Sequence, residues 1–239
     1  MILKTGIFIL FTLIITISLA VLQQKINLDF EKITLPQLAP AIAFLLTVLI
    51  FKDLPFSVNF HFNKPVVIKT LIAFVTPLLL FGISFFAGKQ AGLNVKMTEN
   101  LQSLLPIMLS GILIGAIAEE IGWRGFLQPT LEKKYTILIA AIIVGAIWGL
   151  WHIGHYKNGL LFMSGFLLFS VSASIIIAWL LRGTQFNIII AAVFHIAINL
   201  GFAVFFKSSL SDSRLMLING IVWLIPAAIL SVILFMQNK

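Results

Sequence analysis

The chain has 239 residues, of which 60% are hydrophobic and only 10% are charged. Soluble domains are closer to half apolar and a quarter charged, so this composition indicates a polytopic membrane protein. The absence of cysteine excludes disulfides, thiolate nucleophiles and cysteine-ligated metals. The net charge of +8 comes mainly from lysines between apolar runs, which favours contact with the lipid bilayer. No nucleic-acid motif is present, so no nucleic-acid partner is expected.

Eight apolar runs, separated by short charged segments, follow one another along the chain. They cover residues 5–22, 34–51, 66–87, 101–127, 136–153, 159–181, 184–206 and 215–236. Because a helix needs about 20 apolar residues to cross a bilayer, the pattern predicts an all-α polytopic membrane helix bundle of about eight transmembrane helices. We expect residues 1–239 to form a single integral-membrane domain. The second run is the weakest, since it is short and contains Pro36 and Pro40 near its start.

The first run resembles a signal peptide, because Lys4 precedes an apolar stretch that contains the small-x-small pattern Ser18-Leu19-Ala20. It is longer than the apolar region of a usual signal peptide, so we expect a retained first helix. With eight spans, both termini lie on one side of the membrane, and that side carries a small excess of basic residues. The positive-inside rule then predicts that both termini are cytoplasmic.

Glu119 and Glu120 stand near the end of the fourth apolar run, and Arg124 follows one helical turn later. An ionised group at the bilayer centre costs roughly 2.5–3.5 kcal/mol even on a lenient scale, so three together indicate a functional site. Positions four apart share a helix face, so Glu120 is expected to pair with Arg124. Glu119 is rotated by about 100° and remains available for another role. The alternatives are a packing network between helices and a location in the interfacial zone near the helix end.

Two further polar clusters occur on later apolar runs. The fifth run ends with Trp148 and His152, which lie one turn apart, and His155 follows in the loop. The seventh run contains His195 and Asn199, which share one helix face. In the alternative interpretation, the tryptophan belongs to an interfacial aromatic belt, the histidines are packing residues and the asparagine joins helices. For His155 we favour packing.

Together, the three clusters offer a carboxylate, two imidazoles and an amide beside one internal ion pair. A carboxylate can act as a general base on water, an imidazole can share the proton, and a His–Asn pair can donate hydrogen bonds to an oxyanion. This set suffices for amide hydrolysis without a covalent nucleophile. Metal catalysis is the competing chemistry, because His152 and His155 have helical ligand spacing. Arg124 beside the acids opposes a cation and no His-Glu-x-x-His occurs, so no metal or other cofactor is expected.

The clusters resemble, in order and spacing, the three motifs of the CPBP family of CAAX proteases and bacteriocin-processing enzymes, also called Abi. The type II CAAX prenyl endopeptidase is a eukaryotic relative of this family. The first motif, Glu-Glu-x-x-x-Arg, is similar to Glu119–Arg124. The second, Phe-x-x-x-His, is similar to Trp148–His152 with Trp in place of Phe, and the third, His-x-x-x-Asn/Asp, to His195–Asn199. The resemblance covers roughly residues 100–205.

The resemblance implies an intramembrane, metal-independent glutamic endopeptidase with an all-helical fold. It implies that Glu119 is the water-activating base, helped by His152, and that the third motif supplies donors to an oxyanion or a substrate carbonyl. The implied catalytic residues are therefore Glu119, His152, His195 and Asn199, and the supporting residues are Glu120, Arg124 and Trp148. The tryptophan keeps a large aromatic side chain, so it is expected to alter the shape of the pocket without disabling catalysis.

The short, basic, cysteine-free chain is similar to prokaryotic members, so we expect a bacterial plasma membrane and a peptide or membrane-protein segment as substrate. Bacteriocin immunity and peptide maturation are roles that the resemblance allows. One alternative is a non-catalytic membrane scaffold or bacteriocin-immunity partner. Another is a transporter or proton relay that uses Glu119 and the histidines. No repeated halves with broken helices are visible in the sequence, which counts against the transporter.

Overall fold

A computed structural model describes residues 2–29, 34–52, 59–99, 102 and 112–236. Within these ranges the regular secondary structure is helical, apart from one isolated parallel bridge between Asn59 and Asn187. The α-helices are α1 (Ile2–Lys25), α2 (Ala39–Ile50), α3 (Lys64–Gln90), α5 (Leu113–Gly122), α6 (Gln128–Glu132), α7 (Ile137–Trp151), α8 (Leu160–Leu181), α9 (Ile188–Gly201) and α10 (Ser213–Met236). Shorter 3-10 or π segments are η1 (Leu35–Leu38), η4 (Trp123–Leu127), η5 (Ile153–Asn158), η6 (Phe202–Phe206) and η7 (Lys207–Ser209). The prediction of an all-α fold is confirmed for the described part of the chain.

Five of the described helical segments are long and apolar enough to cross a membrane. They are α1, α3, α8, the continuous segment Ile188–Ser209, and α10. The second and fifth apolar runs form shorter apolar helices, Leu35–Ile50 and Ile137–Trp151. The fourth predicted span, 101–127, lies partly outside the described residues. The structure therefore supports an integral membrane protein with several spans, whereas the predicted count of about eight is not confirmed.

Side-chain caps start the two helices that carry the histidines of the second and third motifs. The Thr136 side chain accepts a hydrogen bond from the backbone N–H of Ile139, 3.3 Å away, at the start of α7. Asn187 accepts one from Ile189 N at 3.1 Å and so begins α9. Each cap satisfies a backbone donor that the first helical turn leaves unpaired. The start of each helix is thus encoded locally in the sequence.

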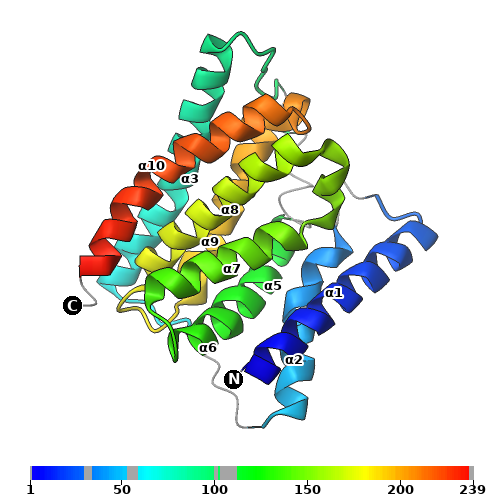
Figure 1. The fold of residues 1–239 in the computed structure, drawn as a ribbon, viewed down its shortest axis with the longest axis vertical. Coiled ribbons are helices and arrows are strands. Elements are labelled where there is room, and N and C mark those ends of the chain that lie inside the picture. The colour runs from blue at the N-terminus through cyan, green and yellow to red at the C-terminus, as the bar shows by residue number, and fades with distance from the viewer. Residues whose placement is uncertain (1, 30–33, 53–58, 100–101, 103–111, 237–239) are drawn as a thin grey trace.

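Helix α8 lies in the interior of the bundle and packs against α7 and α10, while α3 packs against α9 and α10 (Figure 1). Helix α5 packs against α9 and α2, and α2 packs against α1. Within the most apolar 18 residues of each helix, 67% of the residues are buried in α8 but only 17% in α1. Helix α1 therefore lies at the edge of the bundle, where its exposed apolar side chains suit contact with lipid.

Two glycines allow close helix contacts beside the candidate site. A Cβ on Gly122 of α5 would lie 2.7 Å from the backbone oxygen of Pro40 in α2. A Cβ on Gly145 of α7 would lie 2.6 Å from Val171 Cα in α8. Because backbone atoms cannot move aside as a side-chain end does, any larger residue would push these helices apart.

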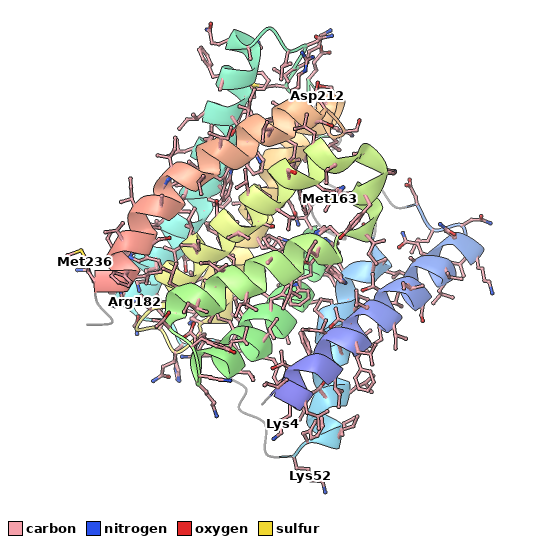
Figure 2. All side chains as sticks on the ribbon, in the orientation of Figure 1. Lys4, Lys52, Met163, Arg182, Asp212 and Met236 are labelled. Carbon is pink, nitrogen blue, oxygen red and sulfur yellow. The ribbon has the colours of Figure 1, made fainter. Side chains whose placement is uncertain are left out.

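Charged residues lie at both ends of the helix bundle. Figure 2 shows Lys4, Lys52 and Arg182 toward the end of the bundle where α10 finishes at Met236, and Asp212 at the other end. The first residues of α1 and the last residues of α10 lie at the first of these ends (Figure 1). This arrangement agrees with the expectation that the termini share one side, whereas their cytoplasmic location stays a prediction.

Candidate active site

The first motif lies where α5 continues directly into the π-helical segment η4. Its side chains are inside the protein: Glu119 is 1% exposed, and Glu120 and Arg124 are fully buried. The expected pair along the helix is present, with Arg124 NH1 donating to Glu120 Oε1 at 3.0 Å. Their burial rules out an exposed interfacial location for these three residues. A π-helical turn at this point agrees with the frequent occurrence of such turns at functional sites.

His195 joins the third motif to both glutamates. Its Nδ1 lies 2.8 Å from Glu120 Oε1, and its Nε2 lies 4.0 Å from Glu119 Oε2. Glu120 Oε1 is therefore shared by Arg124 and His195, a contact that the sequence analysis did not predict. The residues are 75 positions apart, so no local pattern could reveal the contact. It depends on the packing of α5 against α9.

Trp148 contacts each of the other motifs. Its indole Nε1 donates to Glu119 Oε2 at 2.9 Å, and its ring lies 5.1 Å from the Arg124 guanidinium carbon. The ring also packs edge-on against His195, with centroids 5.3 Å apart. Trp148 is only 2% exposed, so it does not belong to an interfacial belt. The departure from the Phe of the family motif thus adds a donor that phenylalanine lacks.

His152 caps the end of α7. Its Nδ1 lies 2.7 Å from the Trp148 backbone oxygen. Because a carbonyl only accepts, Nδ1 carries the hydrogen, and in the neutral ring Nε2 is left as an acceptor. His152 also stacks on His155, with ring centroids 5.6 Å apart and an interplanar angle of 2°. Burial, assisted by Lys157, lowers the pKa of His155 to about 4, so that ring is neutral at pH 7.

Two adjoining cavities connect these residues. The larger has a volume of about 490 Å³ and is lined by the second half of α1, residues between 34 and 37, Glu119, and residues 151–154. The smaller, about 100 Å³, is lined by His152, His155, His195, Asn199 and aromatic rings of α8. His152 and Gln37 border both cavities. All four predicted catalytic side chains therefore face one or other of these adjoining spaces.

Two polar groups at the cavities have no hydrogen-bond partner among the described residues. One is Glu119 Oε1, although the indole of Trp123 also interacts with this carboxylate. This second indole contact is weak, because Trp123 Nε1 makes no hydrogen bond of normal geometry. The other is the half-buried carboxamide of Asn199. Buried polar atoms are normally paired, so these two are placed to bind water or substrate.

The described residues contain no group of three or more His, Asp or Glu side chains placed to hold a metal ion. The two histidines with metal-ligand spacing, His152 and His155, stack face to face. Stacked rings direct their nitrogen lone pairs within parallel planes and not toward a shared ion. The described part of the site thus offers acid–base groups and hydrogen-bond donors.

Residues 101–201 match a family model described as type II CAAX prenyl endopeptidase Rce1-like. The chain contains an Rce1-like region. All three motifs lie within it, so the resemblance that they suggested is confirmed.

Similarity to staphylococcal proteins extends beyond the Rce1-like region. A lysostaphin resistance protein A of Staphylococcus haemolyticus is 27% identical over 216 residues, covering 86% of this chain and 58% of the relative. The protein of the same name from Staphylococcus aureus is 26% identical over 220 residues, covering 86% of this chain and 50% of the relative. The chain thus spans between half and 58% of the length of these curated relatives.

Proposed function

We propose that the protein is a metal-independent intramembrane endopeptidase that cleaves a peptide or membrane-protein segment with water activated by Glu119 and His152. The observation that carries this proposal is that both side chains face the cavity of about 490 Å³. Trp148 holds one oxygen of Glu119, at 2.9 Å, and the other has no hydrogen-bond partner within the described residues. A held carboxylate with one free oxygen is suited to take a proton from water.

The reaction can be written with these groups in defined roles. A water between Glu119 Oε1 and His152 Nε2 gives its proton to the carboxylate, and its oxygen attacks the peptide carbonyl carbon. The C–N bond then breaks, and the proton on Glu119 passes to the departing amine nitrogen. This sequence consumes one water and needs no covalent enzyme intermediate.

Asn199 and His195 are the proposed donors to the oxyanion. The Asn199 carboxamide faces the smaller cavity and has N–H groups available. If His195 Nδ1 donates to Glu120, its Nε2 can donate only when the ring is protonated. Glu120 Oε1, 2.8 Å from Nδ1, is placed to form an ion pair with the protonated ring. Glu120 and Arg124 then hold His195 in place.

The proposed location is the bacterial plasma membrane, with both termini in the cytoplasm. The larger cavity is lined by the half of α1 that is distant from the N-terminus and by the C-terminal end of α7. In this orientation the cavity would lie toward the outer side of the membrane. Much of its lining is apolar, including Ile17, Val21 and Ile153, so we propose an apolar peptide segment as substrate.

The reaction is tested with purified protein in liposomes and a library of apolar peptides. We expect cleavage inside the peptides, and equal rates with and without a chelator, since the proposed groups act without a metal. Mass spectrometry of the products locates the cleaved bond. Loss of cleavage on chelation, restored by Zn²⁺, would instead support a metal-dependent protease.

Trp148→Phe is expected to lower kcat by about tenfold, because it removes a hydrogen bond to a charged group. The aromatic body is kept, so the shape of the site changes little. The matched control is Trp223→Phe, since Trp223 is also fully buried but its Nε1 has no partner in the described structure. Equal kinetic effects of the two substitutions would contradict a role for the Trp148 indole in holding Glu119.

The similarity to lysostaphin resistance protein A supports a second candidate, a part in resistance to lysostaphin. Such a role is compatible with either a protease or a non-catalytic scaffold. This role is measured by the survival of staphylococcal cells that express the chain and are exposed to lysostaphin. Resistance that persists in Glu119→Gln cells would favour the scaffold.

A further inference from the structure

Gln37 of η1 lies where the two cavities adjoin. It lines both the larger and the smaller cavity, a position that it shares with His152. It belongs to none of the three motifs and lies outside the Rce1-like region, residues 101–201. A side chain at this junction would contact a substrate peptide that extends from one cavity into the other.

The Gln37 carboxamide has unused hydrogen-bonding capacity. The side chain is half-buried, and its amide makes no hydrogen bond with another described residue. A carboxamide has two N–H donors and an oxygen that accepts twice. Asn199 presents a second carboxamide without a described partner to the smaller cavity. The junction is therefore bordered by two side-chain amides from opposite parts of the sequence.

Gly115 of α5 makes room for Gln37. A Cβ at position 115 would lie 2.2 Å from Gln37 Oε1 and 2.6 Å from its Cδ. The three nearest atoms to that Cβ all belong to the Gln37 side chain. The absence of a side chain on Gly115 thus allows the carboxamide to lie close to α5, one turn before Glu119.

Peptide main chain is the ligand that suits this arrangement. An amide pairs with an amide through a donor and an acceptor together, whereas an apolar side chain would leave the carboxamide unpaired. The wall of the larger cavity is mostly apolar, with Pro36 and Trp151, whereas the smaller cavity combines aromatic rings such as Phe166 with three histidines and Asn199. The larger cavity therefore favours apolar side chains beside the main-chain contact, and the smaller one offers further polar partners.

We propose that the Gln37 carboxamide binds the substrate main chain where an extended apolar segment passes from the larger cavity into the smaller one. The adjoining substrate main chain enters the smaller cavity, where Asn199 offers a second carboxamide. This inference rests on the proposed peptidase function and assigns part of its substrate recognition to η1, ahead of the Rce1-like region.

The test measures peptide binding in the Glu119→Gln background, where the ligand stays intact. A fluorescent apolar peptide from the cleavage library is titrated into liposomes that carry the protein, and Kd is read by anisotropy. Gln37→Met, which keeps the length of the side chain but removes its amide, is expected to weaken binding by about tenfold. Gln24→Met is the matched control, because Gln24 lines the larger cavity but not the smaller.

Gly115→Ala provides an independent perturbation, since its methyl group must displace the Gln37 carboxamide. We expect it to weaken binding in a chain that retains Gln37. Added to Gln37→Ala, which removes the two closest atoms and leaves only the Cβ at 3.1 Å, it should cause little further loss. This non-additivity is the result expected when two substitutions act through one contact.

A scan with ester-substituted peptides separates substrate contact from a structural role. An ester removes one N–H and weakens the neighbouring carbonyl acceptor. At one peptide position, the ester should weaken binding to protein with Gln37 but not to Gln37→Met protein. Equal penalties in both proteins, or no peptide binding in the first place, would overturn the proposal. Coupling with Gln37, together with no cleavage of any library peptide by the protein that retains Glu119, would instead overturn the peptidase function and retain the binding site.

Discussion

Glu119→Gln is expected to lower kcat for peptide cleavage by about 10²–10⁴-fold, the usual contribution of a general base. Glutamine has nearly the same shape, and its amide oxygen can still accept the hydrogen bond that Trp148 Nε1 donates at 2.9 Å. The amide cannot, however, take a proton from water. The loss should therefore appear in turnover and not in folding, which single-turnover kinetics and a thermal unfolding curve on the same preparation would measure.

Glu132→Gln is the matched control for that substitution. Glu132 is a partly buried carboxyl group that, like Glu119, accepts one side-chain hydrogen bond, from Gln128 Nε2 at 2.8 Å, but it lines a different cavity near the end of α6. Activity should persist in this variant. Unchanged turnover in Glu119→Gln protein would exclude Glu119 as the base, whereas absence of cleavage by the unsubstituted protein would leave the scaffold interpretation.

Arg124→Met is expected to lower the free energy of unfolding by about 3 kcal/mol, the cost of leaving a buried charge without its partner. Arg124 and Glu120 are both fully buried and 3.0 Å apart. A loss of stability at the lower end of the usual range is expected, because His195 remains 2.8 Å from the same oxygen of Glu120. Unfolding in detergent, followed by circular dichroism with increasing denaturant, measures the change.

A second substitution shows whether the uncompensated charge is the cause. Adding Glu120→Gln to Arg124→Met removes the unpaired carboxylate and should restore part of the lost stability. Arg214→Met, at an exposed position on α10, should change the stability by less than about 0.5 kcal/mol. A similarly small change in Arg124→Met would show that the buried pair does not stabilise the fold.

Local sequence patterns predicted much of the fold. The apolar run from 159 to 181 corresponds to α8, Leu160–Leu181, within one residue at its start. The second run instead forms η1 and the shorter α2, because Pro36 and Pro40 allow only a 3-10 turn before the helix becomes regular. The length of the apolar runs thus predicted the positions of the helices well. It did not predict how many of the helices cross the membrane.

The candidate site was predictable only within single helices. The spacing of Glu120 and Arg124 predicted their ion pair, because residues four apart meet on one helix face. The hydrogen bond from Trp148 to Glu119 joins residues 29 positions apart and has no such spacing rule. The proposed role of Gln37 was not predicted from the sequence for the same reason. Gln37 lies in a 3-10 turn, and it contacts Gly115 only because η1 packs on α5.

The sequence by itself determined that this is a helical membrane protein with an ion pair and a second carboxylate on one helix. These properties follow from apolar length, helix periodicity and the high cost of isolated charge in lipid. Only the tertiary structure decided that His195 bridges toward both glutamates, that Trp148 holds Glu119, and that α1 and η1 complete the cavity. Helices in lipid meet through local shape, such as the gap at Gly122 that admits Pro40, and shape complementarity between distant segments leaves no periodic signal in the chain.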